Sequence, residues 1–397
     1  MSTVRRELSK TFRRFYASET SSSVLLIVCT VVSLSIANSA SGTDYLRFWH
    51  THIGELSIDH WISEALMAVF FLLIGLELER ELYNGELSDF RNALLPIFAA
   101  IGGICVPALI YFALNSGTPT QAGIGIPMAT DIAFSLGVLA LLGSRIPASL
   151  KVFLTALAVM DDLGAIIVIA IFYTAEFSVA YLVGAVAVFG ALLVLNRVFH
   201  VMSLVPYLVG GVLMWSLMRE SGVHATIAGV LLAFAIPFSA KQDDEASPSH
   251  RLEHFLQKPV AFIVLPLFAL ANTGIVLGSD WAHNLTSASS LGIIGGLVVG
   301  KPLGIAVACL LVVRIGICRL PLDLGWRHVF GAGLLGGIGF TMSTFITNLA
   351  FAGNARLIND SKAAILLASL TAGAIGFLWL RFFGRPSTPL PTESSRR

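Results

Sequence analysis

Long apolar runs dominate this sequence and decide what it can fold into. Twelve of them approach the length of about 20 residues that an α-helix needs to cross a bilayer. We predict spans at residues 21–41, 62–80, 93–114, 123–143, 149–173, 178–196, 204–218, 222–240, 257–277, 290–313, 328–351 and 362–383. Hydrophobic residues make up 56% of the chain and charged residues 12%, against about 25% charged residues in soluble domains. The sequence therefore predicts an all-α integral membrane protein.

The positive charges of the connecting segments fix an orientation. With the N-terminus inside, the inward segments carry 20 Lys and Arg residues and the outward segments carry 4. We therefore expect a cytoplasmic segment at 1–20, one membrane domain at 21–383 and a cytoplasmic tail at 384–397. The net charge of +1 offers no basic surplus, so we expect no nucleic-acid partner.

The largest outward connection covers residues 42–61. Aromatic and β-branched residues surround Gly54 in this segment, which favours a β-hairpin. An exposed hairpin edge can pair with a second copy of the chain. We therefore regard 42–61 as a possible dimerisation hairpin.

Two spans are rich in residues that interrupt helices. Span four, 123–143, begins with two Gly and a Pro, and span eleven, 328–351, holds five Gly in its first half. Bilayers accept such broken segments where the backbone lines a protein cavity. They are the middle members of spans 3–5 and 10–12, which must run in opposite orientations, and this predicts an inverted-repeat secondary transporter with a site near the midplane. The alternative is that Gly-rich spans pack closely against their neighbours.

Four ionisable residues fall near the middle of predicted spans: Asp131, Asp161, Asp162 and Lys301. A charge at that depth costs at least about 2.5–3.5 kcal/mol, so such residues usually mark an ion path or a proton relay. A structural salt bridge could account for Lys301 and one aspartate, but it leaves two aspartates over.

The paired aspartates suggest the chemistry. Neighbouring helical residues point about 100° apart, so one of Asp161 and Asp162 can face Lys301 while the other faces an aqueous funnel. Carboxylate oxygens suit a hard cation such as Na⁺, and protons compete for the same oxygens. This competition is the minimum that a cation/proton antiporter needs. Asp131 and Lys301 could also offset the partial charges of helix ends where two broken spans cross.

Six segments of the chain resemble the bacterial NhaA-type Na⁺/H⁺ antiporters, and they occur in the family's order. The matching segments are Met-Ala-Val-Phe-Phe-Leu-Leu-Ile-Gly-Leu-Glu-Leu-Glu-Arg-Glu (67–81), Pro-Met-Ala-Thr-Asp-Ile-Ala-Phe-Ser-Leu-Gly (127–137), Asp-Asp-Leu-Gly-Ala-Ile (161–166), Ser-Gly-Val-His-Ala-Thr (221–226), Gly-Lys-Pro-Leu-Gly (300–304) and Gly-Gly-Ile-Gly-Phe-Thr-Met-Ser (336–343).

The resemblance implies twelve helices with interrupted helices four and eleven crossing, a homodimer in the bacterial inner membrane, and electrogenic, pH-dependent exchange of Na⁺ or Li⁺ for H⁺. It implies a transporter without a cofactor and not an enzyme. Asp162 would be the principal carrier and Asp161 would pair with Lys301. Thr130 would contribute to the cation site, and Thr130 and Asp131 would lie in the crossing.

The resemblance also implies a pH-responsive cluster at the cytoplasmic side. Its residues would be Glu77, Arg80, Glu81, Glu253 and His254. As a bare pattern, the spacing of Glu77, Arg80 and Glu81 is typical of a solvated ion-pair face. Gln257 stands where some members have a second histidine, and Glu64 replaces a shorter aspartate.

Three alternatives remain open at this stage. His224 is either a hydrogen-bonded packing residue or a proton carrier. The fold also allows a Na⁺-coupled symporter of an organic solute, although the midplane holds no Arg for an organic anion. An intramembrane aspartyl protease could use Asp131 with Asp162, but Lys301 and Asp161 would then have no function.

Overall fold

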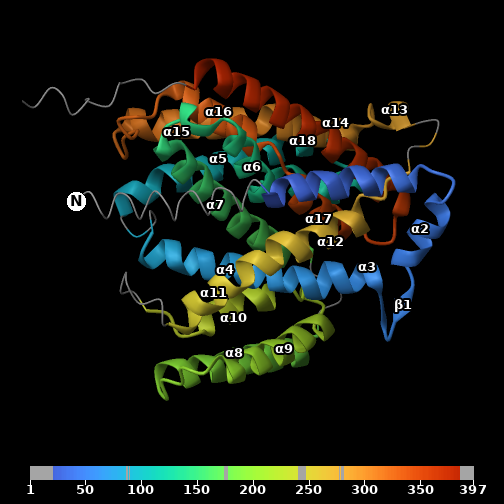
Figure 1. Ribbon diagram of the computed structural model, residues 1–397, viewed down its shortest axis with the longest axis vertical. Helices are drawn as coiled ribbons and strands as arrows, with labels where there is room; N and C mark the ends of the chain where they lie inside the picture. The colour runs from blue at the N-terminus through green and yellow to red at the C-terminus, as the bar shows by residue number, and fades with distance from the viewer. Residues whose placement is uncertain are drawn as a thin grey trace, which may run out of the picture.

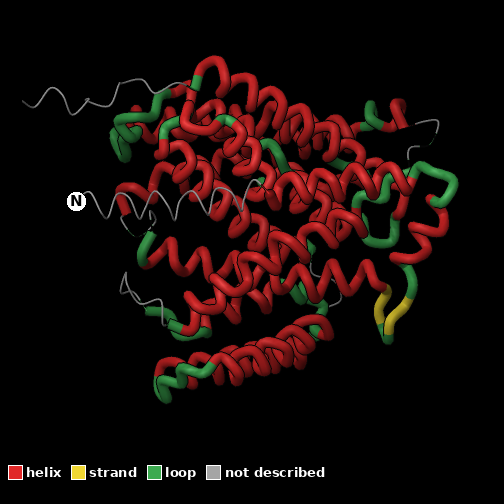
Figure 2. The backbone as a smooth tube through the Cα atoms, in the orientation of Figure 1, coloured by secondary structure: helices red, strands yellow, loops and turns green. Residues whose placement is uncertain are grey.

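The computed structural model describes residues 21–85, 88, 90–173, 178–239, 247–276, 278 and 281–384. The predicted cytoplasmic segment 1–20 and all but the first residue of the tail 384–397 lie outside the described residues. Helices run roughly parallel to one another through most of the molecule, and strands occur at one end only (Figures 1 and 2). The prediction of a mainly helical membrane protein is confirmed.

Seven helical stretches of the described residues are long and apolar enough to cross a membrane, and three bent helix pairs raise that number to ten. The seven are Ile58–Tyr83, Ala93–Asn115, Ala148–Phe172, Val179–Arg197, Pro248–Asn272, Ala288–Ile315 and Ala355–Phe383. The three bent pairs are Ser21–Ala37 with Gly42–Trp49, Pro119–Met128 with Ile132–Leu141, and Trp326–Gly336 with Phe340–Ala350. The remaining two predicted spans correspond to α9 (Leu204–Glu220) and α10 (Ile227–Ala235), which are 17 and 9 residues long.

Several spans consist of more than one element. The stretch Ile58–Tyr83 joins α3 (Ile58–Trp61), η1 (Ile62–Leu66) and α4 (Met67–Tyr83). The stretch Pro248–Asn272 joins α11 (Pro248–Pro259), η4 (Val260–Val264) and α12 (Leu265–Asn272). The stretch Ala288–Ile315 joins α14 (Ala288–Gly295), η5 (Gly296–Gly300) and α15 (Lys301–Ile315). The η elements in these three stretches are single π-helical turns, which insert an extra residue and are frequent at functional sites. The further helices are α5 (Phe90–Asn115), η3 (Gly143–Arg145), α7 (Ala148–Phe172), α8 (Val179–Arg197), α13 (Trp281–Asn284) and α18 (Ala355–Phe383).

The predicted hairpin forms, but over fewer residues than expected. Strands β1 (His52–Ile53) and β2 (Leu56–Ser57) pair antiparallel, and Gly54 takes a positive φ of 69° in the turn. The preceding residues form the helix α2 (Gly42–Trp49) because one side of it packs inward: Trp49 is buried and Tyr45 Oη donates to Leu270 O at 2.8 Å. We call the end of the molecule that carries β1 and β2 the hairpin end.

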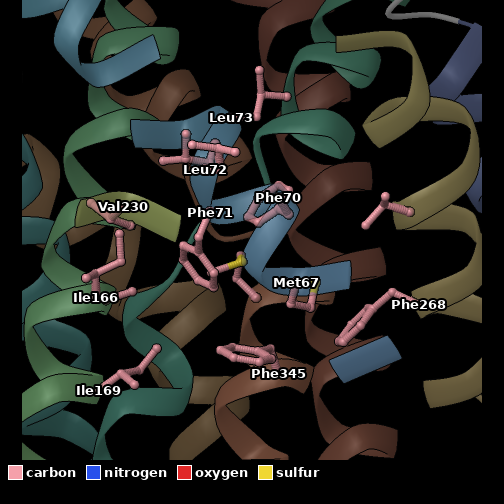
Figure 3. Packing of buried hydrophobic residues seen from close by; sticks show 14 of the residues in the cluster. Met67, Phe70, Phe71, Leu72, Leu73, Ile166, Ile169, Val230, Phe268 and Phe345 are labelled. Atoms are coloured by element: carbon pink, nitrogen blue, oxygen red, sulfur yellow. The ribbon is translucent and has the colours of Figure 1, made fainter. Parts of the chain in front are cut away.

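Two large apolar clusters fill most of the interior, and α7 belongs to both. Its first half, including Leu150 and Leu157, packs in one cluster with α6 (Ile132–Leu141), α15, α16 (Trp326–Gly336) and α18. Its second half, including Ile166 and Ile169, packs in the other cluster with α4, α10, α12 and α17 (Phe340–Ala350). Figure 3 shows part of the second cluster, where Phe71 lies 5.7 Å from Phe345 between ring centroids. Asp161 and Asp162 lie on α7 at the boundary between the two clusters.

Candidate functional site

Two interrupted helices meet at their breaks. The helix η2 (Pro119–Met128) bends by 43° into α6, and α16 bends by 46° into α17. Asp131 N donates to Ile338 O at 2.6 Å, and Thr130 Oγ1 lies 2.7 Å from Gly336 O. Backbone groups that lost their helical partners at the two breaks are therefore satisfied across the crossing, by the other break's backbone or by the Thr130 hydroxyl, as a membrane interior requires.

Glycine allows the second break to approach its neighbours. A Cβ at Gly337 would lie 2.3 Å from Leu297 O, which belongs to the π-helical turn η5 before Lys301. Since the opposing atom is backbone, it cannot rotate away. Gly337 is therefore required for the contact that places η5, and with it Lys301, beside the crossing.

We expect Gly337→Ala to lower the free energy of unfolding by about 1–3 kcal/mol, the usual cost of overpacking. Thermal unfolding of the detergent-solubilised protein measures this. Gly190→Ala is the matched control, because a Cβ at Gly190 meets nothing within 4 Å in the described structure. Equal melting temperatures for the two variants would show that the close approach at Gly337 does not contribute to stability.

Asp131 joins the first turns of two half-helices. Its Oδ1 accepts from Phe134 N at 3.1 Å and so caps α6, while its Oδ2 accepts from Thr341 N at 2.9 Å and from the Thr341 hydroxyl in the first turn of α17. The carboxylate is 2% exposed. Its charge therefore lies where two helix N-termini direct their partial positive charges, as predicted for the crossing.

Lys301 forms the ion pair that the sequence predicts for one of the two aspartates. Its Nζ donates to Asp161 Oδ2 and, at 3.0 Å, to Thr130 Oγ1. The same Thr130 oxygen lies 2.6 Å from Asp161 Oδ2. Lys301 and Asp161 are both 0% exposed, so each compensates a charge that would otherwise be buried alone.

Asp162 differs from its neighbour in having no partner. It is 0% exposed, and neither of its carboxylate oxygens has a hydrogen-bond partner among the described residues. Burying a charge in this way is costly unless a proton or a cation compensates it. The expectation that Asp162 faces an aqueous funnel does not hold in this structure, where the side chain is 0% exposed.

The arrangement of possible metal ligands is the next feature of the site. In the described part of the chain, no three His, Cys, Asp or Glu side chains lie together as metal ligands. A cation at Asp162 would therefore need hydroxyl, carbonyl or water oxygens to complete its shell.

The structure brings together four of the five residues of the predicted pH-responsive cluster. Arg80 Nη1 donates to Glu253, Arg80 Nη2 lies 3.2 Å from Glu81 Oε1, and the charge of Glu77 acts on Arg80. Glu77, Arg80 and Glu81 lie near the end of α4 that is farthest from the hairpin, and Glu253 lies on the adjacent α11. His254 is exposed, and within the described residues no hydrogen bond or ion pair connects it to the other four.

Three further features concern residues that the sequence left open or missed. His224 Nδ1 lies 2.7 Å from Thr226 Oγ1, and its ring packs edge-on against Phe345, which favours the packing interpretation. Glu79 stands in a charged segment of the sequence, which favours an exposed side chain. In the structure it is nevertheless 6% exposed and accepts from Ser249 Oγ at 3.4 Å. The sequence did not single out Thr341 either, which binds Asp131. The signal that could have found it is the hydroxyl residues that follow the Gly-rich break.

A helical membrane protein that buries two carboxylates and a lysine beside two interrupted helices is an ion-translocating protein. Comparison with known proteins identifies the family: the family model described as Na⁺/H⁺ antiporter 1 matches residues 13–380. The chain belongs to this family, and the resemblance drawn from the six segments is confirmed.

Individual relatives agree along nearly the whole chain. The Na⁺/H⁺ antiporter NhaA of Dechloromonas aromatica (strain RCB) is 74% identical over 383 residues, covering 96% of this chain and 98% of the relative. The proteins of the same name from Flavobacterium psychrophilum and Cytophaga hutchinsonii are 57% and 56% identical, each covering 94% of this chain and 96% of the relative.

Proposed function

We propose that Asp162 carries the cation and the proton in the Na⁺/H⁺ antiport that this chain, as a member of its family, performs. One observation supports this choice above all: Asp162 is the member of the buried pair whose two oxygens have no partner among the described residues. A carboxylate in that position can be compensated by H⁺ or by Na⁺, but not by both at once. The protein is accordingly a transporter and not an enzyme.

We assign the neighbouring residues by their contacts. Lys301 compensates Asp161, and Thr130 adds an oxygen between this pair and the crossing. Asp161 Oδ1 has no partner within the described residues, so it is available as a second cation ligand beside Asp162. Asp131 holds the crossing together and compensates its helix ends.

The direct experiment is Na⁺-evoked collapse of a pH gradient in proteoliposomes that contain the purified protein. We expect Na⁺, and also Li⁺, to collapse the gradient, and we expect a membrane potential to change the rate because the exchange is electrogenic. A gradient that persists at every Na⁺ concentration would refute the function.

The finer architecture is also part of the proposal. Ten candidate spans together with α9 and α10 give twelve, and the two bent pairs at the crossing suit inverted repeats of spans 3–5 and 10–12. We place the hairpin end outside the bacterial inner membrane and both termini in the cytoplasm. The β1–β2 edge would then join two copies into a homodimer.

The competing functions gain no support from the relatives or from the site. In an aspartyl protease both aspartates must face one scissile bond, but each oxygen of Asp131 accepts hydrogen bonds from a helix N-terminus. An organic-solute symporter needs a roomy polar pocket, whereas Asp162 is 0% exposed in the described structure.

We expect exchange to be nearly silent at acidic pH and to rise steeply toward alkaline pH. Cation ligands must be deprotonated, so protons on Asp161 and Asp162 exclude Na⁺ without any separate sensor. In that case saturating Na⁺ restores the full rate at low pH. The exposed position of His254 favours this competition as the larger effect.

Measuring apparent Na⁺ affinity against pH in the parent and in His254→Ala separates competition from a sensor. Competition requires that saturating Na⁺ restore the maximal rate at low pH in both proteins. A maximal rate that collapses at low pH despite saturating Na⁺, and that shifts along the pH axis in His254→Ala, would instead establish a sensor.

A further inference from the structure

A second polar group lies toward the hairpin end, apart from the site described above. We call it the hairpin cluster; it consists of Asn272, Asn348 and Lys362. Lys362 Nζ donates to Asn272 Oδ1 at 3.3 Å, and Asn348 Nδ2 donates to the same oxygen at 2.7 Å. The three side chains come from α12, α17 and α18, so they join elements that are distant in the sequence.

Lys362 stands at the first residue of the predicted span 362–383, but the observed helix begins earlier, and the side chain is partly exposed. α18 begins at Ala355, so Lys362 lies about 10 Å along the helix at 1.5 Å per residue. Among the described residues no carboxylate lies within ion-pair distance of it; the acid whose charge acts on it is Asp59, which is already bonded to Ser57. A cationic side chain inside a membrane segment without an acidic partner marks a functional site by default.

The cluster lies where a cation is favoured. Asn272 is the last residue of α12, and Asn348 is two residues from the end of α17. Helix C-termini carry partial negative charge, and two of them approach each other here. Asparagine carbonyl oxygens are also suitable ligands for Na⁺. The ammonium of Lys362 therefore occupies a position whose chemistry would equally accept a free monovalent cation.

Polar side chains continue from this cluster toward the crossing. Thr341, Thr344 and Asn348 are spaced three and four residues apart and lie on one face of α17. Thr341, at the inner end of that face, binds Asp131. On α18, Ser369 lies two turns below Lys362 on the same face, and its buried hydroxyl has no partner among the described residues.

We propose that the hairpin cluster is a second cation-binding position, between Asp162 and the hairpin end, which Lys362 fills with its own ammonium. Na⁺ binds there to Asn272 Oδ1 after displacing Lys362, and the amide of Asn348, whose Nδ2 donates to that oxygen, rotates to present its own carbonyl oxygen to the cation. The lysine is thus a tethered competitor that weakens Na⁺ binding from the hairpin face. This inference rests on the Na⁺/H⁺ exchange proposed above and adds a binding step at one face of it.

The test compares the two faces of the membrane. Na⁺-driven proton movement is measured against Na⁺ concentration in right-side-out and inside-out vesicles, which gives one apparent KM for each face. We expect Lys362→Met to lower the KM at the hairpin face by about fivefold, the effect of one partly screened charge, and to leave the KM at the other face unchanged. Lys362→Arg, which keeps the charge, should change the KM less than Lys362→Met.

Two further variants make the result decisive. Asn348→Ala removes an oxygen ligand and should raise the KM at the hairpin face alone. If Lys362→Met does not insert into the membrane, Asn348→Ala still tests the proposal. Arg356→Gln is the matched control, because Arg356 lies at the same end of α18 but is 80% exposed and paired with Asp360; neither KM should change.

A purely structural cluster predicts different results. Equal changes of KM at both faces, or no change at either face in Lys362→Met and Asn348→Ala, would overturn the proposal. If Asp162→Asn still exchanges Na⁺ in the same vesicles, the assignment of the carrier fails, whereas the face-specific KM values still decide the hairpin cluster.

Discussion

Asp162→Asn is expected to reduce Na⁺-driven proton movement to background while leaving the protein as stable as the parent or more stable. An amide keeps the shape of the side chain but can neither take up the proton nor neutralise the cation. Stability should not fall, because the carboxylate forms no hydrogen bond within the described structure that the substitution could break. The change instead removes a buried group whose charge is costly.

Two measurements check this prediction. Exchange is assayed in proteoliposomes, and thermal unfolding is recorded with and without Na⁺. Ligand binding to the native state raises stability, so Na⁺ should raise the melting temperature of the parent but not of Asp162→Asn. Asp44→Asn, at an exposed carboxylate in α2, is the control and should behave like the parent. Robust exchange by purified Asp162→Asn would remove Asp162 as the carrier.

Lys301→Ala is expected to impair stability at least as strongly as transport. Removing one partner of a buried ion pair leaves the other charge uncompensated, at a cost of about 3–5 kcal/mol unless that group takes up a proton. Here the abandoned group is Asp161, which among the described residues would retain Thr130 alone as a hydrogen-bond partner. The melting temperature and the initial exchange rate should therefore both fall.

A double variant tests the reason for that loss. In Lys301→Ala with Asp161→Asn, neither charge remains, so much of the lost stability should return even if transport does not. If Lys301 were itself a compulsory proton carrier, transport would vanish in Lys301→Ala while the melting temperature stayed near that of the parent. That result would place the lysine in the transport cycle and not in a structural pair.

Sequence reasoning located the charged centre because membrane spans leave few places for such residues. An apolar run of fixed length places Asp161 and Asp162 near its middle, and Gly and Pro reveal where a span must break. These arguments need only distances along the chain. They therefore indicated which helices carry the site and which aspartates had to be distinguished.

The contacts between helices could not be predicted in this way. Thr341 reaches Asp131 only because the two breaks cross in one register, and no spacing within either span specifies that register. Likewise, the π-helical turn before Lys301 depends on its packing against Gly337. His254 follows Glu253 directly in the sequence, yet the 100° between neighbouring helical residues leaves it exposed.

The double attachment of Asp131 restricts how this protein can change shape. One carboxylate completes the first turn of both α6 and α17, so separating these half-helices would leave unpaired N–H groups of both in an apolar interior. We therefore expect α6 and α17 to move together, as a single rigid body, in any conformational change that exposes Asp162.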